Sequence, residues 1–248
     1  MGDDWNKHWD AYSASNALNP AQTYRQKLIF EALGLERAPS PVRLLDLGCG
    51  NGELLGEAAR RRPDLEVMGL DLAERACELA REKFPKGRFF AQNFAAPLTV
   101  PKECDGFATH VVCTEVLEHL DDPAAALRNV RRLMAPRAKL VVTVPGGPMS
   151  AFDKHIGHRG HFTRARLKEV IESAGFATRV DGAGAPFFNL YRLVVVARGE
   201  KLIQDAGGDG RQLPLSAKLA MRAFDTLFKF NAGSGRFGWQ LVAVAEAA

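Results

Sequence analysis

Between residues 42 and 180 the chain alternates short apolar runs with longer amphipathic segments. The apolar runs have the length of buried strands and cover residues 42–47, 65–70, 89–92, 106–113, 139–144 and 177–180. The segments between them repeat apolar positions every three or four residues, as helices do, over residues 52–61, 73–83, 123–134 and 164–174. This alternation predicts an α/β fold with a parallel sheet that is doubly wound, so that helices cover both faces.

The first 39 residues precede this alternation and are expected to form a helical cap. If the start is helical, its aromatic side chains lie within one or two turns of each other: Trp5, Trp9 and Tyr12. A second helix is predicted over residues 21–35, opened by Asn19-Pro20 and ended by Pro39 and Pro41.

The most informative stretch is a glycine-rich turn that joins the first predicted strand to the first helix. Gly48, Gly50 and Gly52 follow the apolar run, and Asp71 ends the next strand. In a doubly wound fold such a turn presents backbone to a nucleoside while the carboxylate binds the ribose. A dinucleotide site needs a third glycine at position 53, which is Glu53 here, so a pyrophosphate is disfavoured and a cationic ligand is tolerated.

Three segments in order resemble the class I S-adenosylmethionine-dependent methyltransferases. They are the glycine turn at residues 44–55, the segment 111–123 and the strand at 139–147. The resemblance covers roughly residues 40–180. It implies S-adenosylmethionine as cofactor and a Rossmann-like, mostly parallel sheet of seven strands with an antiparallel last strand. The cofactor-binding residues expected on this basis are Arg25, Asp46, Gly48, Gly50, Asp71, Leu72, Asn93, Phe94 and Thr114.

The last 70 residues contain two apolar runs that read equally well as strands, 191–197 and 239–245. Because a sheet of this family closes with a single antiparallel hairpin, we favour 239–245 for its last strand. The chain then divides into a cap (1–39), a core (40–185), a helical insertion (186–238) and the final strand (239–248). We expect the insertion to cover the acceptor pocket. Its aromatic residues suggest an apolar or aromatic acceptor, although packing within the insertion explains them equally well.

Methyl transfer from a sulfonium is an in-line displacement, so the protein must align donor and acceptor and remove a proton from a hydroxyl acceptor. Glu115, Glu118 and His119 follow the fourth strand and share one face of a helical turn. This Glu-x-x-Glu-His pattern resembles the metal-dependent members of the superfamily, which include the ubiquinone-pathway O-methyltransferases and the small-RNA 3′-end methyltransferases.

Those members carry a further histidine downstream, and this chain has three, His155, His158 and His161. The expected metal ligands for a divalent cation such as Mg²⁺ are therefore Glu115, Glu118, His119 and His161. The other interpretation needs no metal: His119, His158 and His161 are then catalytic residues that line the acceptor pocket, where an imidazole can act as general base.

The composition agrees with a globular enzyme of 248 residues. The net charge is only +4 and the basic residues are scattered, so nucleic acid is not the expected partner. No run of about 18 apolar residues is present, which predicts no membrane span, and the lack of a signal peptide predicts a cytoplasmic protein.

The leading hypothesis is methyl transfer to a small molecule, at a hydroxyl. Two alternatives stay open: an RNA 3′-end-type, metal-dependent methyltransferase, and a non-catalytic protein that binds S-adenosylmethionine.

Overall fold

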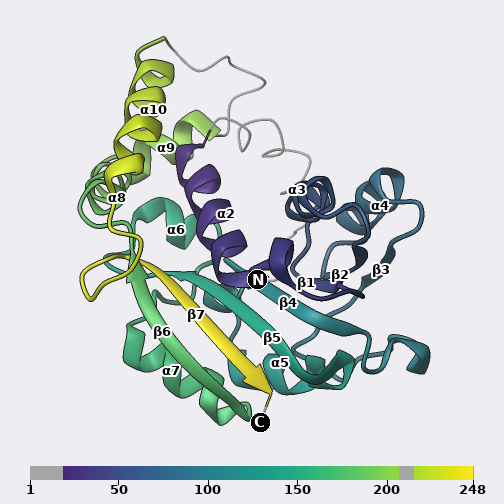
Figure 1. The fold of residues 1–248 in the computed structure, drawn as a ribbon. Coiled ribbons are helices and arrows are strands. Elements are labelled where there is room, and N and C mark those ends of the chain that lie inside the picture. The colour runs from purple at the N-terminus through teal and green to yellow at the C-terminus, as the bar shows by residue number, and fades with distance from the viewer. Residues whose placement is uncertain (1–18, 207–214, 248) are drawn as a thin grey trace.

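Seven strands form one sheet in the order β3-β2-β1-β4-β5-β7-β6 (Figure 1). The computed structural model describes residues 19–206 and 215–247. The strands are β1 (Arg43–Leu47), β2 (Glu66–Asp71), β3 (Arg88–Ala91), β4 (Ala108–Thr114), β5 (Met134–Pro145), β6 (Phe176–Ala183) and β7 (Gln240–Ala247). Neighbours from β3 to β5 pair in parallel, and β7 is antiparallel to both β5 and β6. The predicted Rossmann-like sheet with an antiparallel last strand is confirmed.

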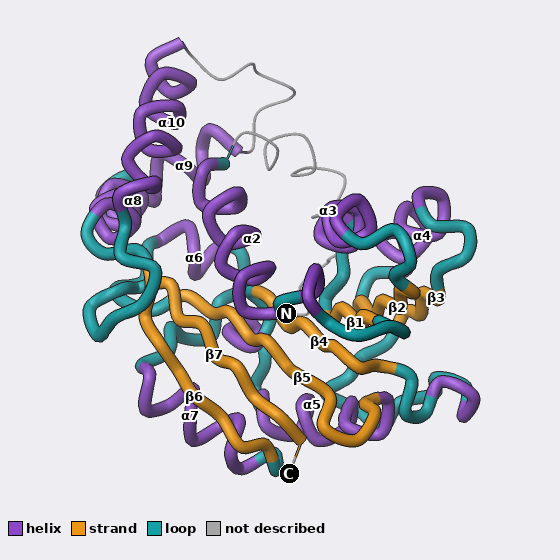
Figure 2. The backbone as a smooth tube through the Cα atoms, in the orientation of Figure 1, coloured by secondary structure: helices purple, strands orange, loops and turns teal. Residues whose placement is uncertain are grey.

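Helices cover both faces of this sheet (Figures 1 and 2). They are α2 (Pro20–Leu33), α3 (Glu53–Arg61), α4 (Glu74–Lys83), α5 (Pro123–Val130), α6 (Ala151–His155), α7 (Arg164–Ser173), α8 (Phe187–Ala197), α9 (Gly199–Ala206) and α10 (Leu215–Leu227). Figure 1 shows α2, α3 and α4 on one side and α5 and α7 on the other. None of the helices in these two described ranges is both long and apolar enough to cross a bilayer.

The alternation of side chains along each strand explains why the sheet is buried on both faces. In β1, Leu44 joins a cluster with residues of α2, α3 and α4, while Leu45 and Leu47 join the cluster that includes α5 and α7. Asp46 lies between them, at the end of the strand, and is also buried. The sheet thus fixes the position of this carboxyl without exposing it to solvent.

Two predicted helix boundaries were wrong. The helix predicted over 21–35 ends at Leu33, because Gly34 adopts a left-handed conformation with φ of 66° and caps it. The helix predicted over 123–134 ends at Val130. A short 3₁₀ turn, Arg131–Leu133, follows, and Met134 already belongs to β5, where it pairs with Ala108 of β4.

A helical insertion, α8 to α10, separates β6 from β7, as the fold prediction required (Figure 1). The ambiguous run 191–197 is helical and lies in α8, and β7 takes the favoured run near 239–245. Tyr24 of α2, Phe188 of α8 and Phe228 pack together and join the insertion to α2. The predicted first helix, with Trp5, Trp9 and Tyr12, lies outside the described residues.

Candidate functional site

The glycine turn after β1 is shaped by left-handed backbone. Gly48 has φ of 78°, and a Cβ there would lie only 2.4 Å from Cγ2 of Val116. The N–H of Gly50 donates to Oδ2 of Asp71 at 2.8 Å, and the N–H of Ala73 donates to Oδ1 at 2.9 Å. Asp71 therefore braces the turn from the end of β2, and a glycine is required at position 48.

Asp46 is a buried carboxyl next to this turn. Its Oδ1 is inaccessible and has no hydrogen-bond partner. Burial, and secondarily the negative charge of Asp71, raises the pKa of Asp46 to about 8. Burial also raises the pKa of Asp71, although its backbone hydrogen bonds oppose this. A buried carboxyl whose pKa is raised as far as that of Asp46 favours a ligand that carries positive charge.

One cavity of about 760 Å³ joins the glycine turn to the segment that follows β4. Of the predicted cofactor residues, all except Gly50 line it: Arg25, Asp46, Gly48, Asp71, Leu72, Asn93, Phe94 and Thr114. Its other end is lined by residues that include Glu115, His119, Ile156 and Arg159. This volume lies within the range of small-molecule sites, which are often about 300–1,000 Å³. None of the described residues of the insertion lines the cavity.

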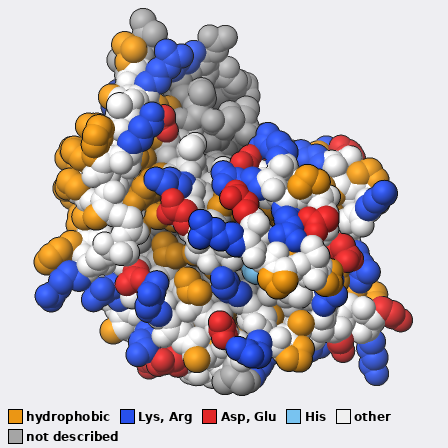
Figure 3. Space-filling model, in the orientation of Figure 1, with side chains coloured by type: hydrophobic (Ala, Val, Ile, Leu, Met, Phe, Trp, Pro, Cys, Tyr) orange, Lys and Arg blue, Asp and Glu red, His pale blue; other side chains and the backbone are white. Residues whose placement is uncertain are grey.

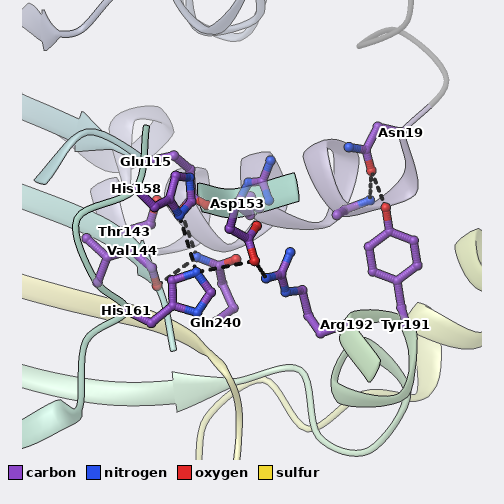
Figure 4. A network of polar contacts seen from close by, with 12 residues as sticks. Asn19, Glu115, Thr143, Val144, Asp153, His158, His161, Tyr191, Arg192 and Gln240 are labelled. Carbon is purple, nitrogen blue, oxygen red and sulfur yellow. Dashed lines mark hydrogen bonds and ion pairs between the residues drawn. The ribbon is translucent and has the colours of Figure 1, made fainter. Parts of the chain in front are cut away.

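Glu115 is held at the cavity wall in a strained conformation, with φ of 55°. Its Oε1 accepts hydrogen bonds from Oγ1 of Thr143 at 3.1 Å and Nε2 of Gln240 at 2.9 Å (Figure 4). Nη1 of Arg25 lies 3.6 Å from its Oε2. Residues of β5, β7 and α2 therefore fix the position of this carboxylate together, and its Oε1 is engaged within the protein.

The histidine-containing loop after α6 forms a directed hydrogen-bond chain (Figure 4). Nδ1 of His161 lies 3.1 Å from the carbonyl oxygen of Gly147, and its Nε2 lies 3.2 Å from Nδ1 of His158. A carbonyl only accepts, so Nδ1 of a neutral His161 carries the proton and Nε2 accepts from His158. This hydrogen-bond network assigns the tautomer of His158 and leaves its Nε2 as a free lone pair.

The imidazole rings of His158 and His161 are both neutral near pH 7. Burial, and secondarily the proximity of His119, lowers the pKa of His158 to about 3. Burial also lowers the pKa of His161. The ring of His119 meets that of His158 edge-on, with centroids 4.6 Å apart. Of the three histidines predicted to be catalytic, only His119 lines the cavity, and His158 and His161 lie behind it.

Asp153 joins this loop to the insertion. Its Oδ2 accepts from Nη2 of Arg192 on α8 at 2.7 Å and from the N–H of Ser150 at 2.7 Å. The same oxygen lies 3.6 Å from Nε2 of His161. The guanidinium of Arg192 therefore compensates the charge of this buried carboxylate without any metal.

The predicted metal ligands are not brought together as one set. Among the described residues, one group with ligand atoms within 4.8 Å of each other combines Glu118, His119 and His158, and a second combines Asp153, His158 and His161. Glu115 belongs to neither group and is engaged elsewhere. Both carboxylate oxygens of Glu118 are inaccessible and lack hydrogen-bond partners. Burial, followed by the charge of Glu115, raises the pKa of Glu118 well above its usual range.

Sequence reasoning missed the residues that support the site from a distance. Thr143, Gln240, Asp153 and Arg192 carry no motif, because their contacts depend on the pairing of β5 with β7 and on the packing of α8 against α6. Tyr24, the neighbour of Arg25 in sequence, does not line the cavity and is buried among the aromatic residues of the insertion.

Comparisons with known proteins give the family. A family model described as a methyltransferase domain matches residues 21–179. The ubiquinone biosynthesis O-methyltransferase of Xanthomonas axonopodis pv. citri (strain 306) is 30% identical over 189 residues, which cover 72% of this chain and 75% of that protein.

Solved structures share the fold at low sequence identity. The [4+2]-cyclase SpnF has a TM-score of 0.57 and 19% identity, covering 90% of this chain and 79% of its own. Phosphoethanolamine N-methyltransferase 2 of Haemonchus contortus, solved with S-adenosyl-L-methionine, has a TM-score of 0.56 and 16% identity. The match covers 90% of this chain and 52% of that protein. The family model and the curated relative show that the chain belongs to the class I S-adenosylmethionine-dependent methyltransferases and uses S-adenosylmethionine as its cofactor.

Proposed function

We propose that this methyltransferase acts on a hydroxyl group of a small-molecule acceptor. The observation that carries the proposal is a continuous cavity, which joins the glycine turn at one end to His119 at the other. Donor and acceptor can then lie next to each other in one cavity, as an in-line displacement requires. The name of the curated relative, an O-methyltransferase, favours a hydroxyl over an amine. It favours neither the RNA 3′-end-type methyltransferase nor the non-catalytic binding protein.

At the donor end we assign the nucleoside to the glycine turn, with Asp71 on the ribose hydroxyls. The buried carboxyl of Asp46 complements a cation because its proton is readily lost when a positive charge approaches. Leu72 is 52% exposed and lines the cavity, so it offers an apolar surface for a purine ring. Arg25 is assigned to the carboxylate of the methionine part of the cofactor.

At the acceptor end we assign proton removal to His119. Two imidazoles with centroids 4.6 Å apart disfavour a double positive charge, and His158 has the strongly lowered pKa. His119 therefore takes the proton, while His158 and His161 position its ring from behind. A neutral amine is already nucleophilic, so this arrangement has its use with a hydroxyl.

The alternative to a base is a divalent cation, which Glu118, His119 and His158 also fit, and in that case His119 is a ligand rather than the base. The two unpartnered oxygens of Glu118 need either a proton or a cation, and two imidazoles with one carboxylate suit a transition metal better than Mg²⁺. When bound there, such a cation would lower the pKa of an acceptor hydroxyl as a Lewis acid. In this proposal His158 is a ligand, and Glu115 and His161, which the sequence suggested, are not.

The proposed activity is tested with S-adenosylmethionine carrying a labelled methyl group. The purified protein is incubated with phenols, catechols, aliphatic alcohols and amines in separate panels. We expect label on hydroxyl oxygens. Label found only on amines would contradict the hydroxyl assignment. Tight donor binding with no transfer to any panel would favour the non-catalytic alternative.

Glu118→Gln tests the cation proposal through stability. The amide resembles the protonated carboxyl, so the metal-free variant should unfold at a temperature close to that of the wild type. Mn²⁺ or Zn²⁺ at 100 times Kd should raise the free energy of unfolding of the wild type by about 2.7 kcal/mol, and with it the melting temperature, and should leave the variant unchanged. Glu103→Gln, at an exposed position, is the control. Equal melting-temperature shifts in all three proteins would remove the proposed site.

Donor binding should depend on pH through Asp46. Its pKa of about 8 in the empty protein means that a cationic ligand must displace a proton below pH 8. The affinity for S-adenosylmethionine relative to S-adenosylhomocysteine, which lacks the sulfonium charge, should rise by up to about tenfold per pH unit from pH 6 to 8 and then level off. Calorimetric titrations of both ligands give this ratio. Asp46→Asn should flatten the profile, and a constant ratio in the wild type would refute the assignment.

A further inference from the structure

The exposed apolar side chains are concentrated in one part of the molecule. Seven large apolar residues are exposed among the described residues, and Leu72 is accounted for by the cavity. The other six all belong to the insertion, residues 186–238: Leu190, Leu193, Val194, Leu219, Phe230 and Phe237. We call these six residues the outer face of the insertion. Figure 3 shows hydrophobic side chains collected along the edge of the molecule formed by α8 and α10.

Helix α8 is apolar on two opposite sides. Phe188 and Tyr191 face inward and pack against Phe228. Leu190, Leu193 and Val194 are exposed, at the spacing of one helical stripe, and have 48%, 48% and 39% of their surface accessible. A stripe of large apolar residues on a helix is normally covered, so this stripe is the face of α8 that lacks a partner within the described residues.

The insertion also carries the excess positive charge of the chain. Residues 186–238 contain eight Lys and Arg and four Asp and Glu, out of 33 and 29 in the whole chain, which leaves 25 of each elsewhere. One of the eight, Arg192, is paired with the buried Asp153 and does not contribute to the surface. Exposed basic residues lie close to the apolar ones in sequence: Arg198, Lys201, Arg222, Lys229 and Arg236. The guanidinium of Arg236 lies 5.4 Å from the ring centroid of Phe237. Two exposed acids, Glu200 and Asp225, are interspersed.

We propose that the outer face of the insertion docks the protein on a phospholipid surface that contains anionic headgroups. Apolar residues that enter the interface, surrounded by basic residues, are the combination that binds such a surface. A second copy of the chain is a poorer occupant, because a symmetric contact would bring two positively charged faces together. Helices α8 and α10 have 11 and 13 residues, which is too short to cross a bilayer but long enough to lie along its surface.

Vesicle sedimentation tests this proposal with the full chain and without any assay of methyl transfer. The protein is mixed with vesicles of phosphatidylcholine alone or with 30 mol% phosphatidylglycerol (about one anionic lipid in three). We expect binding to the anionic vesicles, weak binding to the neutral ones, and a decline as salt is raised to about 0.5 M. A protein that stays in the supernatant with both vesicles overturns the proposal. Light scattering then tells whether a dimer covers the face instead.

Two double variants separate the contributions of charge and apolar surface. Arg222→Gln/Lys229→Gln should lower the partition coefficient about 30-fold, since each basic residue near an anionic surface contributes about fivefold. Leu190→Gln/Leu193→Gln should abolish the residual vesicle binding that the wild type keeps at high salt. Arg166→Gln/Lys168→Gln, on the exposed side of α7, is the matched control for charge and should bind like the wild type. Equal losses in the control and the α10 variant would show nonspecific attraction and overturn the assignment of this face.

Discussion

Asp71→Asn should weaken binding of S-adenosylmethionine by about 100-fold. The carboxylate accepts the N–H of Gly50 at 2.8 Å and the N–H of Ala73 at 2.9 Å, and it lines the cavity. An amide turns one of these acceptors into a donor and leaves a buried N–H without a partner, which costs about 1–3 kcal/mol. The loss of a charged hydrogen bond to a ribose hydroxyl adds a similar amount. Calorimetric titration measures the affinity.

Glu74→Gln is the control for this variant, because it removes the same charge a few residues further along, at an exposed position of α4. Its donor affinity should match that of the wild type, since an exposed ion pair such as Glu74 with Arg81 contributes little. The melting temperature of Asp71→Asn should also fall. Donor affinity within threefold of the wild type would contradict the role assigned to Asp71.

His119→Ala should lower kcat by about 10³-fold while donor affinity stays within a few-fold of the wild type. His119 is the one predicted catalytic histidine that lines the cavity, and general-base catalysis contributes about 10²–10⁴-fold. The measurement is single-turnover methyl transfer to the best hydroxyl acceptor found in the labelled panel. The pH profile of the wild type should lose its acidic limb in the variant.

His155→Ala is the matched control, because His155 belongs to the same histidine-rich segment yet is exposed at the end of α6. Its kcat should be unchanged. His161→Ala should lower kcat less than His119→Ala does, since its ring acts only through His158. If His119→Ala kept full activity while His158→Ala lost it, the base would have to be reassigned to His158.

The glycine turn and the parallel half of the sheet could be predicted because their signals are local. A buried strand, glycines that must adopt positive φ, and an acidic residue at the next strand end all lie within 30 residues. The run 191–197 was ambiguous for the opposite reason. Its β-branched residues suit a strand, but packing of Phe188 and Tyr191 against distant aromatic residues selects a helix.

The site was predicted less completely than the fold because its supporting contacts cross the chain. Glu115 was expected to ligate a metal, but its carboxylate is held by Gln240, whose position depends on the pairing of Gln240 with Pro145. The sequence could not reveal that His158, rather than His155 or His161, lies next to Glu118 and His119. The loop geometry decides this, through the hydrogen bond from the N–H of Arg159 to the carbonyl of Glu118.

The place of β7 in the sheet has a consequence for synthesis on the ribosome. β7 lies between β5 and β6, and among the described strands β6 pairs with β7 alone. A nascent chain that ends before residue 240 therefore has β6 and one edge of β5 unpaired. The carboxylate of Glu115 then also lacks its hydrogen bond from Gln240. Because a domain folds as a unit, the acceptor end is completed only after the last strand is made. Until then the two open strand edges are sites at which chaperones or other nascent chains can bind.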